Sequence, residues 1–256
     1  VASVSTMINN GIDNSKKAIE FDTTNYYNYT SLARVADVAA SLKVANAYEN
    51  SRGAYIEALK YNPANPAIYL SLAKLDAVNG KIDEAKQNIQ RSLILKQDYT
   101  DAVFLLSQIQ TQNGEIANAI ESTKVATQIE PSNSVLFFQL GILYYNNKDY
   151  KNAAEALNKA VSLNGQYANA RYFLGLAYAR LNDDKNAIIQ FEELAKTNPD
   201  NQEVALILSN LKLGKSPFSD AKPPIDSKPE KRSKLPVAEK TNTSSGASSN
   251  TTTKKS

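Results

Sequence analysis

The residues best able to do acid–base or metal chemistry in this chain are two acidic pairs, Asp183-Asp184 and Asp83-Glu84. Both kinds of chemistry usually draw on histidine or cysteine partners, and the chain contains neither residue type. Asp183-Asp184 lies at a break between two apolar stretches, where solvated charge is expected. Asp83-Glu84 opens a helical stretch, where negative charge favours the helix dipole. The sequence therefore predicts no catalytic residues and no metal site.

Cofactor and nucleic-acid binding are also disfavoured. The chain has no glycine-rich phosphate loop, so no nucleotide cofactor is expected. Residues 214–256 hold nine Lys/Arg and four acidic residues, a charge of +5, whereas residues 1–213 carry −2. A nucleic-acid-binding domain would place its basic residues on the folded part of the chain. The charge distribution instead indicates a mildly acidic body followed by a basic tail.

The elements that position these residues repeat along the chain every 34 residues. Small residues occupy one register position, each preceded by leucine, and alanine occupies a second. The first series is Ala73, Ser107, Gly141, Gly175 and Ser209, and the second is Ala85, Ala119, Ala153 and Ala187. A fixed period of this length is typical of helical repeat proteins. Within a unit, apolar residues recur at steps of three to four and are interrupted once, which predicts two helices.

These residues resemble the tetratricopeptide repeat (TPR) family over residues 5–213. The unit that begins at Ala168 carries the family's residue types at Leu174-Gly175, Tyr178, Ala187, Phe191 and Pro199. Leu194 stands where the family usually has alanine, and the family's first-helix tryptophan is absent. The resemblance implies an all-α fold, a right-handed α-solenoid of antiparallel TPR helix pairs. A C-terminal capping helix and a disordered tail would follow the pairs.

The period divides the chain into eight expected segments. These are the second helix of a truncated TPR (1–25), a TPR with a six-residue insertion (26–65), four regular TPRs (66–99, 100–133, 134–167 and 168–201), a capping helix (202–213) and a disordered basic tail rich in Pro, Ser and Thr (214–256). The insertion falls near Ala39–Asn50 and is expected to lengthen the first helix or its turn, either as a tolerated loop or as a docking projection. Within one unit, Gly141 and Ala153 are expected to meet where the two helices cross closely.

The resemblance also implies where a partner would bind. In TPR proteins the first helices line a concave groove, chiefly through unit positions 2, 5, 9 and 12. Position 5 corresponds here to Leu70, Phe104, Phe138 and Tyr172; position 9 to Lys74, Gln108, Ile142 and Leu176; and position 12 adds Tyr145. These residues predict an apolar and aromatic track, since exposed aromatic side chains are favoured anchors for a partner.

Two alternatives stay open for that track. Phe138 and Tyr172 would also fit the core between adjacent repeats. The Lys/Asn clamp of TPRs that bind acidic chaperone tails is not matched, because Leu70, Phe104, Phe138 and Tyr172 stand where its lysine would be. An apolar extended or helical protein segment is therefore the expected partner.

Two functions from different classes fit the sequence. The first is a non-catalytic scaffold, a monomer that binds a peptide or helical segment in its groove. The second is an accessory domain of a larger bacterial membrane protein. Ala47–Asn50 and Asn65–Ala73 resemble the C-terminal TPR segments of multi-span proteins similar to O-antigen ligases and polymerases, and the chain begins on half a repeat. That resemblance implies an upstream membrane part and a tether to the membrane.

Overall fold

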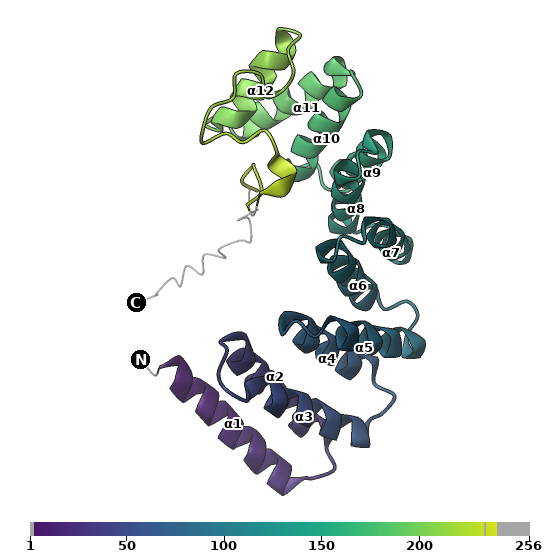
Figure 1. The fold of residues 1–256 in the computed structure, drawn as a ribbon, viewed down its shortest axis with the longest axis vertical. Helices are drawn as coiled ribbons and strands as arrows, with labels where there is room; N and C mark the ends of the chain where they lie inside the picture. The colour runs from purple at the N-terminus through teal and green to yellow at the C-terminus, as the bar shows by residue number, and fades with distance from the viewer. Residues whose placement is uncertain (1–2, 233, 240–256) are drawn as a thin grey trace, which may run out of the picture. The chain divides into compact units, whose positions relative to one another are not determined.

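The computed structural model describes residues 3–232 and 234–239, and within these ranges its regular secondary structure is helical (Figure 1). The chain divides into two units, Val1–Leu136 and Phe137–Ser256. The helices, in chain order, are α1 (Val4–Phe21), α2 (Tyr26–Ser41), α3 (Ala47–Tyr61), α4 (Pro66–Val78), α5 (Ile82–Leu95), α6 (Thr100–Gln112), α7 (Ile116–Ile129), α8 (Ser134–Asn146), α9 (Tyr150–Leu163), α10 (Ala168–Arg180), α11 (Asp184–Thr197), α12 (Gln202–Lys212) and a 3₁₀ turn at Pro229–Lys231.

The helices repeat with the period found in the sequence. The first helices of successive pairs, α4, α6, α8, α10 and α12, begin at residues 66, 100, 134, 168 and 202. The second helices, α5, α7, α9 and α11, begin at residues 82, 116, 150 and 184. Each start therefore follows its predecessor by 34 residues, which confirms the prediction of an all-helical repeat fold.

Asparagine and aspartate side chains fix several of these starts. Asn65 accepts a hydrogen bond from the backbone N–H of Ala67, and Pro66 supplies a first helical residue whose missing N–H costs nothing there. Asp183 accepts from the backbone N–H of Asn186 and caps α11. The Asp183-Asp184 pair, which could have suggested chemistry, therefore serves to begin a helix.

The turn inside each regular pair needs one residue with left-handed backbone geometry. This residue is Gly80, Gly114, Lys148 or Asn182, with φ of 74°, 77°, 61° and 59°, again 34 residues apart. Glycine takes this conformation without steric cost, whereas a side chain at the same position is disfavoured. The last two turns are therefore more strained than the first two.

The first unit is held together partly by one buried and one half-buried carboxylate. Asp76 is fully buried on α4, where it accepts hydrogen bonds from Tyr48 Oη at 2.9 Å and Asn88 Nδ2 at 2.8 Å. Asp37 on α2 accepts from Tyr55 Oη at 2.6 Å and from the Ser51 hydroxyl. Burial, with the hydrogen bond to Asp76, raises the pKa of Tyr48 to about 12. These bonds join α3 to both α2 and α4 and satisfy carboxylates that would otherwise be costly to bury.

The six-residue insertion is divided between a helix and a turn. Helix α2 has 16 residues where α4 has 13, and the turn that follows it contains Lys43 and Asn46 with φ of 57° and 60°. Asp37, whose hydrogen bonds join α2 to α3, precedes this turn, and the two helices pack closely on each other. The extra residues therefore extend the pair without interrupting its contacts.

The second unit shows why its first helices carry glycine. A Cβ added at Gly141 would lie 2.4 Å from Leu157 Cγ, and one added at Gly175 would lie 2.7 Å from Phe191 Cε2. Both distances are far below van der Waals contact, so neither helix pair could pack as closely with a larger residue. The sequence predicted that Gly141 would meet Ala153, but its three nearest atoms all belong to Leu157, one helical turn further along α9.

The described part of the tail differs from the predicted disorder of residues 214–256. Residues 215–232 and 234–239, named here the C-terminal segment, pack on α10 and α12, where Val237 and Pro229 are buried (Figure 1). Composition alone suggested too few apolar residues to offset the ordering entropy. Hydrogen bonds from Asn169, Asn201 and Asn210 to backbone carbonyl oxygens of the segment add stabilisation that the few apolar residues do not provide. The remainder of the predicted disordered tail, residues 240–256, lies outside the described residues.

Candidate functional site

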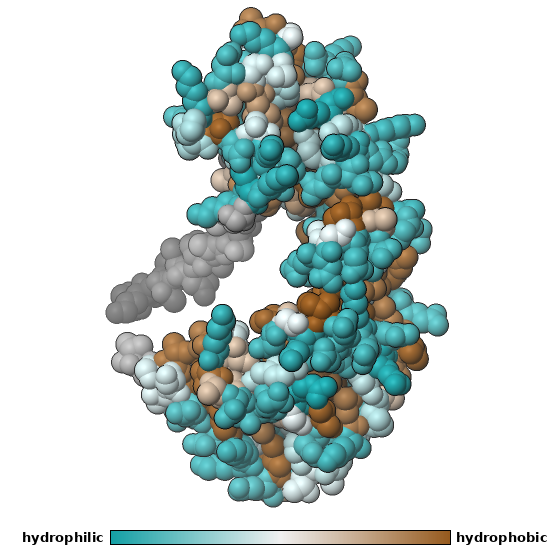
Figure 2. All heavy atoms as spheres, viewed as in Figure 1, coloured by the Kyte–Doolittle hydropathy of each residue, from teal (hydrophilic) through white to brown (hydrophobic). Residues whose placement is uncertain are grey.

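In the first unit, the predicted groove residues differ in exposure. Leu70 is buried in the core with Ala73 and Ile89, and Phe104 is half-buried. Lys74 and Gln108 are exposed. On the face seen in Figure 2, apolar side chains appear as separate patches among hydrophilic ones rather than as a continuous stripe.

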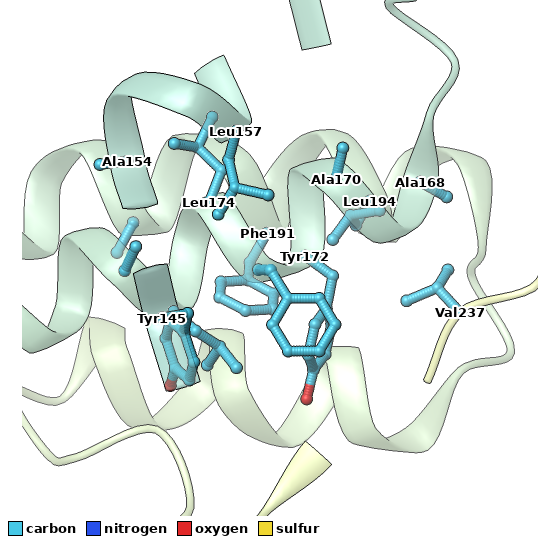
Figure 3. Packing of buried hydrophobic residues seen from close by; sticks show 14 of the residues in the cluster. Tyr145, Ala154, Leu157, Ala168, Ala170, Tyr172, Leu174, Phe191, Leu194 and Val237 are labelled. Atoms are coloured by element: carbon cyan, nitrogen blue, oxygen red, sulfur yellow. The ribbon is translucent and has the colours of Figure 1, made fainter. Parts of the chain in front are cut away.

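In the second unit, the predicted groove residues converge on one core. Phe138, Tyr145, Tyr172 and Leu176 are all buried, and Ile142 packs against the same cluster. The three aromatic members of this set surround Phe173. The centroid of the Phe173 ring lies 6.2 Å from that of Phe138, 5.8 Å from that of Tyr145 and 5.3 Å from that of Tyr172. Figure 3 shows Tyr172 and Phe191 in this packing, where the two rings meet edge to face with their centroids 5.6 Å apart. Of the two alternatives for Phe138 and Tyr172, the structure places both residues in the core.

Over this core lies the C-terminal segment, which is held through its backbone. Asn169, at the start of α10, donates from Nδ2 to the carbonyl oxygen of Val237 at 2.8 Å and accepts from the Val237 N–H at 3.1 Å. Asn201, which caps α12, donates to the carbonyl oxygen of Pro236 at 3.0 Å. The paired bonds of Asn169 satisfy both backbone polar groups of one residue, Val237, an arrangement that does not depend on that residue's side chain.

The same segment supplies an anion to the N-terminus of α10. The Glu239 carboxylate accepts from the backbone N–H of Ala168 at 2.8 Å, the N–H of Asn169 at 2.9 Å and Asn169 Nδ2 at 2.6 Å. No side chain of residue 167 caps this helix, so its first N–H groups are available to a carboxylate. Burial, with a smaller effect of the Glu239 charge, raises the pKa of Tyr167 to about 12.

A buried carboxylate on α12 completes the contact. Glu203 is 8% exposed, accepts from the Tyr172 hydroxyl and pairs with Arg232 Nη1 of the C-terminal segment at 2.7 Å. Burial first, and the Glu203 charge second, raise the pKa of Tyr172 well above its usual range, so this hydroxyl stays protonated and donates. Arg232 also donates to the backbone carbonyl of Asp226. Glu203 thus pairs with a cation of the segment, while Asn169 forms hydrogen bonds with its backbone.

Between the segment and the helices there is a cavity of about 820 Å³. The helices contribute Tyr145, Leu176 and Arg180 to its wall, and the segment contributes Phe218 and Glu230 among others. Two predicted groove residues, Tyr145 and Leu176, therefore line this space, although each is at most 5% exposed. The remaining lining residues are Asn146, Lys148, Tyr150, Ser216, Pro217, Ser227, Lys228 and Lys231.

Sequence reasoning missed the residues that make these contacts, although its own register contained one signal. Asn169 and Glu203 each occupy the second position of a 34-residue period, one of the four positions expected to face the groove. The predicted groove residues all come from positions 5, 9 and 12. Val237 and Glu239 carry no such signal, because they lie beyond the last repeat.

The comparisons with known proteins agree with the fold. Residues 138–202 match a family model described as a tetratricopeptide repeat. No curated protein matches the chain. The C-terminal part of a TPR repeat-containing protein from Cytophaga hutchinsonii superposes with a TM-score of 0.66 at 18% identity, covering 81% of this chain and 83% of that one.

Two other solved structures are similar at comparable identity. YrrB, whose structure is described as "a TPR protein with an unusual peptide-binding site", has a TM-score of 0.58 at 20% identity, and the match covers 75% of this chain and 95% of that one. MamA from Desulfovibrio magneticus has a TM-score of 0.55 at 17% identity, covering 68% and 97%. At these identities the likeness shows the fold alone, a TPR-type stack of antiparallel helix pairs.

Proposed function

We propose that the chain is a non-catalytic protein-interaction scaffold, and that the second unit binds extended protein segments on the face formed by α8, α10 and α12. One observation carries the proposal. Asn169 makes two hydrogen bonds to the backbone of a single residue of the C-terminal segment, through Nδ2 to the Val237 carbonyl and through Oδ1 to the Val237 N–H. A surface that holds one segment by its backbone has the chemistry to hold another.

The fold and the site both support this proposal. YrrB, which has a similar fold, is described as having a peptide-binding site, though that description concerns YrrB alone. In this chain the N-terminus of α10 binds the Glu239 carboxylate and the carboxylate of Glu203 binds Arg232, so a bound segment would meet a donor group and an anion at two different helices. The nine groove residues predicted from the sequence stay a prediction, with Tyr145 and Leu176 best placed because they face the cavity.

A selection from a phage-displayed library of linear peptides, with the full chain immobilised, tests the function. We expect enriched peptides to lose at least about tenfold in affinity on Asn169→Ala, because the loss of two peptide-directed hydrogen bonds costs about 1–3 kcal/mol. Asn158→Ala, which changes an exposed asparagine of α9, is the matched control. The proposal fails if no peptide is enriched, or if the enriched peptides bind Asn169→Ala as tightly as they bind the parent.

The membrane-accessory function stays a prediction from the sequence. Within residues 3–232 and 234–239, no helix combines the length and the apolar character needed to cross a membrane. The same residues contain no group of three or more His, Cys, Asp or Glu side chains that could hold a metal ion.

A further inference from the structure

The C-terminal segment covers the surface to which we assign partner binding. It contacts α10 through Asn169 and α12 through Asn201, Glu203 and Asn210. It also forms one wall of the cavity that Tyr145 and Leu176 line. Any outside segment that uses Asn169 must therefore replace the bonds that Asn169 makes to Val237.

The segment makes these contacts with a specific order of chemical groups. Arg232 pairs with the buried Glu203, and Glu239 caps α10. Between them in sequence, Val237 is buried in the same cluster as Ala168 and Tyr172 (Figure 3). Each group meets a complementary partner on the helices: the cation meets an anion, the branched apolar side chain of Val237 is only 3% exposed within the apolar core, and the anion meets a helix N-terminus. Leu235, between Arg232 and Val237, is 55% exposed and plays no part in this order.

The attachment is also of a kind that can be released. Most described residues between Lys215 and Glu239 are exposed or half-buried, and few apolar side chains, such as that of Val237, are buried. Ordering each residue of such a segment costs about 1–2 kcal/mol, whereas burying one valine returns about 1.5–3 kcal/mol. Hydrogen bonds and one ion pair must therefore supply much of the remaining stabilisation, and water can replace them when the segment detaches.

We propose that residues 226–239 are a ligand that the chain binds to itself, and that an outside partner competes for the same surface with a segment of the same chemistry. Such a partner carries a cation, then a branched apolar residue, then a carboxylate two residues later. This inference rests on the proposed function and adds to it both the partner's chemistry and its regulation. A tethered ligand is present at an effective concentration of about 1 mM, so it weakens an outside ligand of similar intrinsic affinity by about tenfold or more.

The test uses the full chain and a fluorescein-labelled peptide with the sequence of residues 226–239. The released variant Arg232→Ala/Val237→Ala removes the ion pair and the buried valine. Its matched control, Lys234→Ala/Leu235→Ala, removes a basic and an apolar side chain that are both exposed. Hydrogen exchange at the amides of Ala168 and Asn169, which donate to Glu239, reports whether the segment has left α10.

We expect fast exchange at these two amides in the released variant, and peptide binding at least about tenfold tighter than in the parent and the control. Glu239→Gln, which leaves the buried groups in place, should shift both readouts in the same direction. Peptides with aspartate in place of the valine, or lysine in place of the final glutamate, should bind the released variant at least about tenfold more weakly.

Three results would overturn the proposal, and they separate it from the proposed function. Equal peptide binding by the parent and the released variant means that the surface binds segments but that its own segment does not compete. Unchanged exchange at Ala168 and Asn169 means that Arg232 and Val237 do not hold the segment in place. Fast exchange without peptide binding by any variant removes both the self-binding proposal and the proposed function.

Discussion

Replacing Gly141 by alanine should destabilise the second unit, although the same substitution in a helix normally stabilises it. The added Cβ would lie 2.4 Å from Leu157 Cγ and 2.8 Å from its Cδ2, whereas unstrained carbon atoms approach to about 3.5–4 Å. Leu157 is fully buried, so it cannot swing into solvent. Either its side chain leaves its preferred rotamer or α8 and α9 separate by about an ångström at this crossing.

The size of the effect follows from two opposed contributions. Glycine to alanine in a helix interior gains about 1 kcal/mol of helix propensity. Overpacking in a core costs about 1–3 kcal/mol, and the 2.4 Å approach places Gly141 toward the upper end. We therefore expect the free energy of unfolding to fall by about 1–2 kcal/mol. Gly53→Ala in α3 is the matched control, because no atom lies within 4 Å of its Cβ position, and it should raise the free energy by about 0.5–1 kcal/mol.

Urea unfolding followed by far-ultraviolet circular dichroism measures both changes. Hydrogen exchange in α8 and α9 assigns the loss to that helix pair, since repeat proteins can unfold unit by unit. A double-mutant cycle with Leu157→Ala identifies the cause: in that background Gly141→Ala should become neutral or stabilising, because the obstructing side chain is gone. A Gly141→Ala chain as stable as the Gly53→Ala chain would refute the close crossing of α8 on α9.

Two further predictions concern a strained turn and a buried hydroxyl. Lys148→Gly should raise the free energy of unfolding by about 1 kcal/mol in urea titrations, because Lys148 has φ of 61° and left-handed geometry costs about 1–2 kcal/mol for a non-glycine residue. Lys151→Gly, inside α9, is its control and should lower stability, so equal effects would contradict the assigned turn. Burial, and to a smaller extent the charge of Glu239, raises the pKa of Tyr167 in the folded chain to about 12. The unfolded chain therefore loses the phenolic proton at lower pH, and the free energy of unfolding should fall between about pH 10 and 12. Tyr167→Phe should flatten that loss in thermal unfolding curves relative to the exposed control Tyr27→Phe, and parallel curves would contradict it.

The repeat fold could be predicted from the sequence because close helix packing restricts residue type at fixed positions. Glycine at residues 141 and 175 and alanine at 153 and 187 recur because larger side chains would not fit between the helices. Those restrictions are periodic, so one sequence displays them several times. The turns at Lys148 and Asn182 share the geometry of Gly80 and Gly114 without sharing the residue, and residue type alone does not reveal them.

The candidate site was harder to predict because exposure depends on what the chain places over a surface. Tyr172 stands at a groove position, yet it is fully buried, and its hydroxyl is used by Glu203. Alanine at Tyr172 would therefore test the stability of the core more than the binding of a partner. The segment that covers this surface attaches through bonds between residues 68–71 positions apart, such as Asn169 with Val237 and Glu239. Contacts that occur only once produce no periodic pattern in the sequence.

The second position of each 34-residue period nevertheless points to the candidate site. That position holds Ala67, Asp101, Val135, Asn169 and Glu203 in successive units. Within the second unit, its last two members provide an amide that pairs with a peptide backbone and a carboxylate that pairs with a guanidinium. Because both occupy the same place on α10 and α12, one helix spacing sets the distance between the backbone contact and the charged contact. The repeat that builds the fold thus also places the two helix contacts of the C-terminal segment, which presents a cation at α12 before a branched residue and a carboxylate at α10.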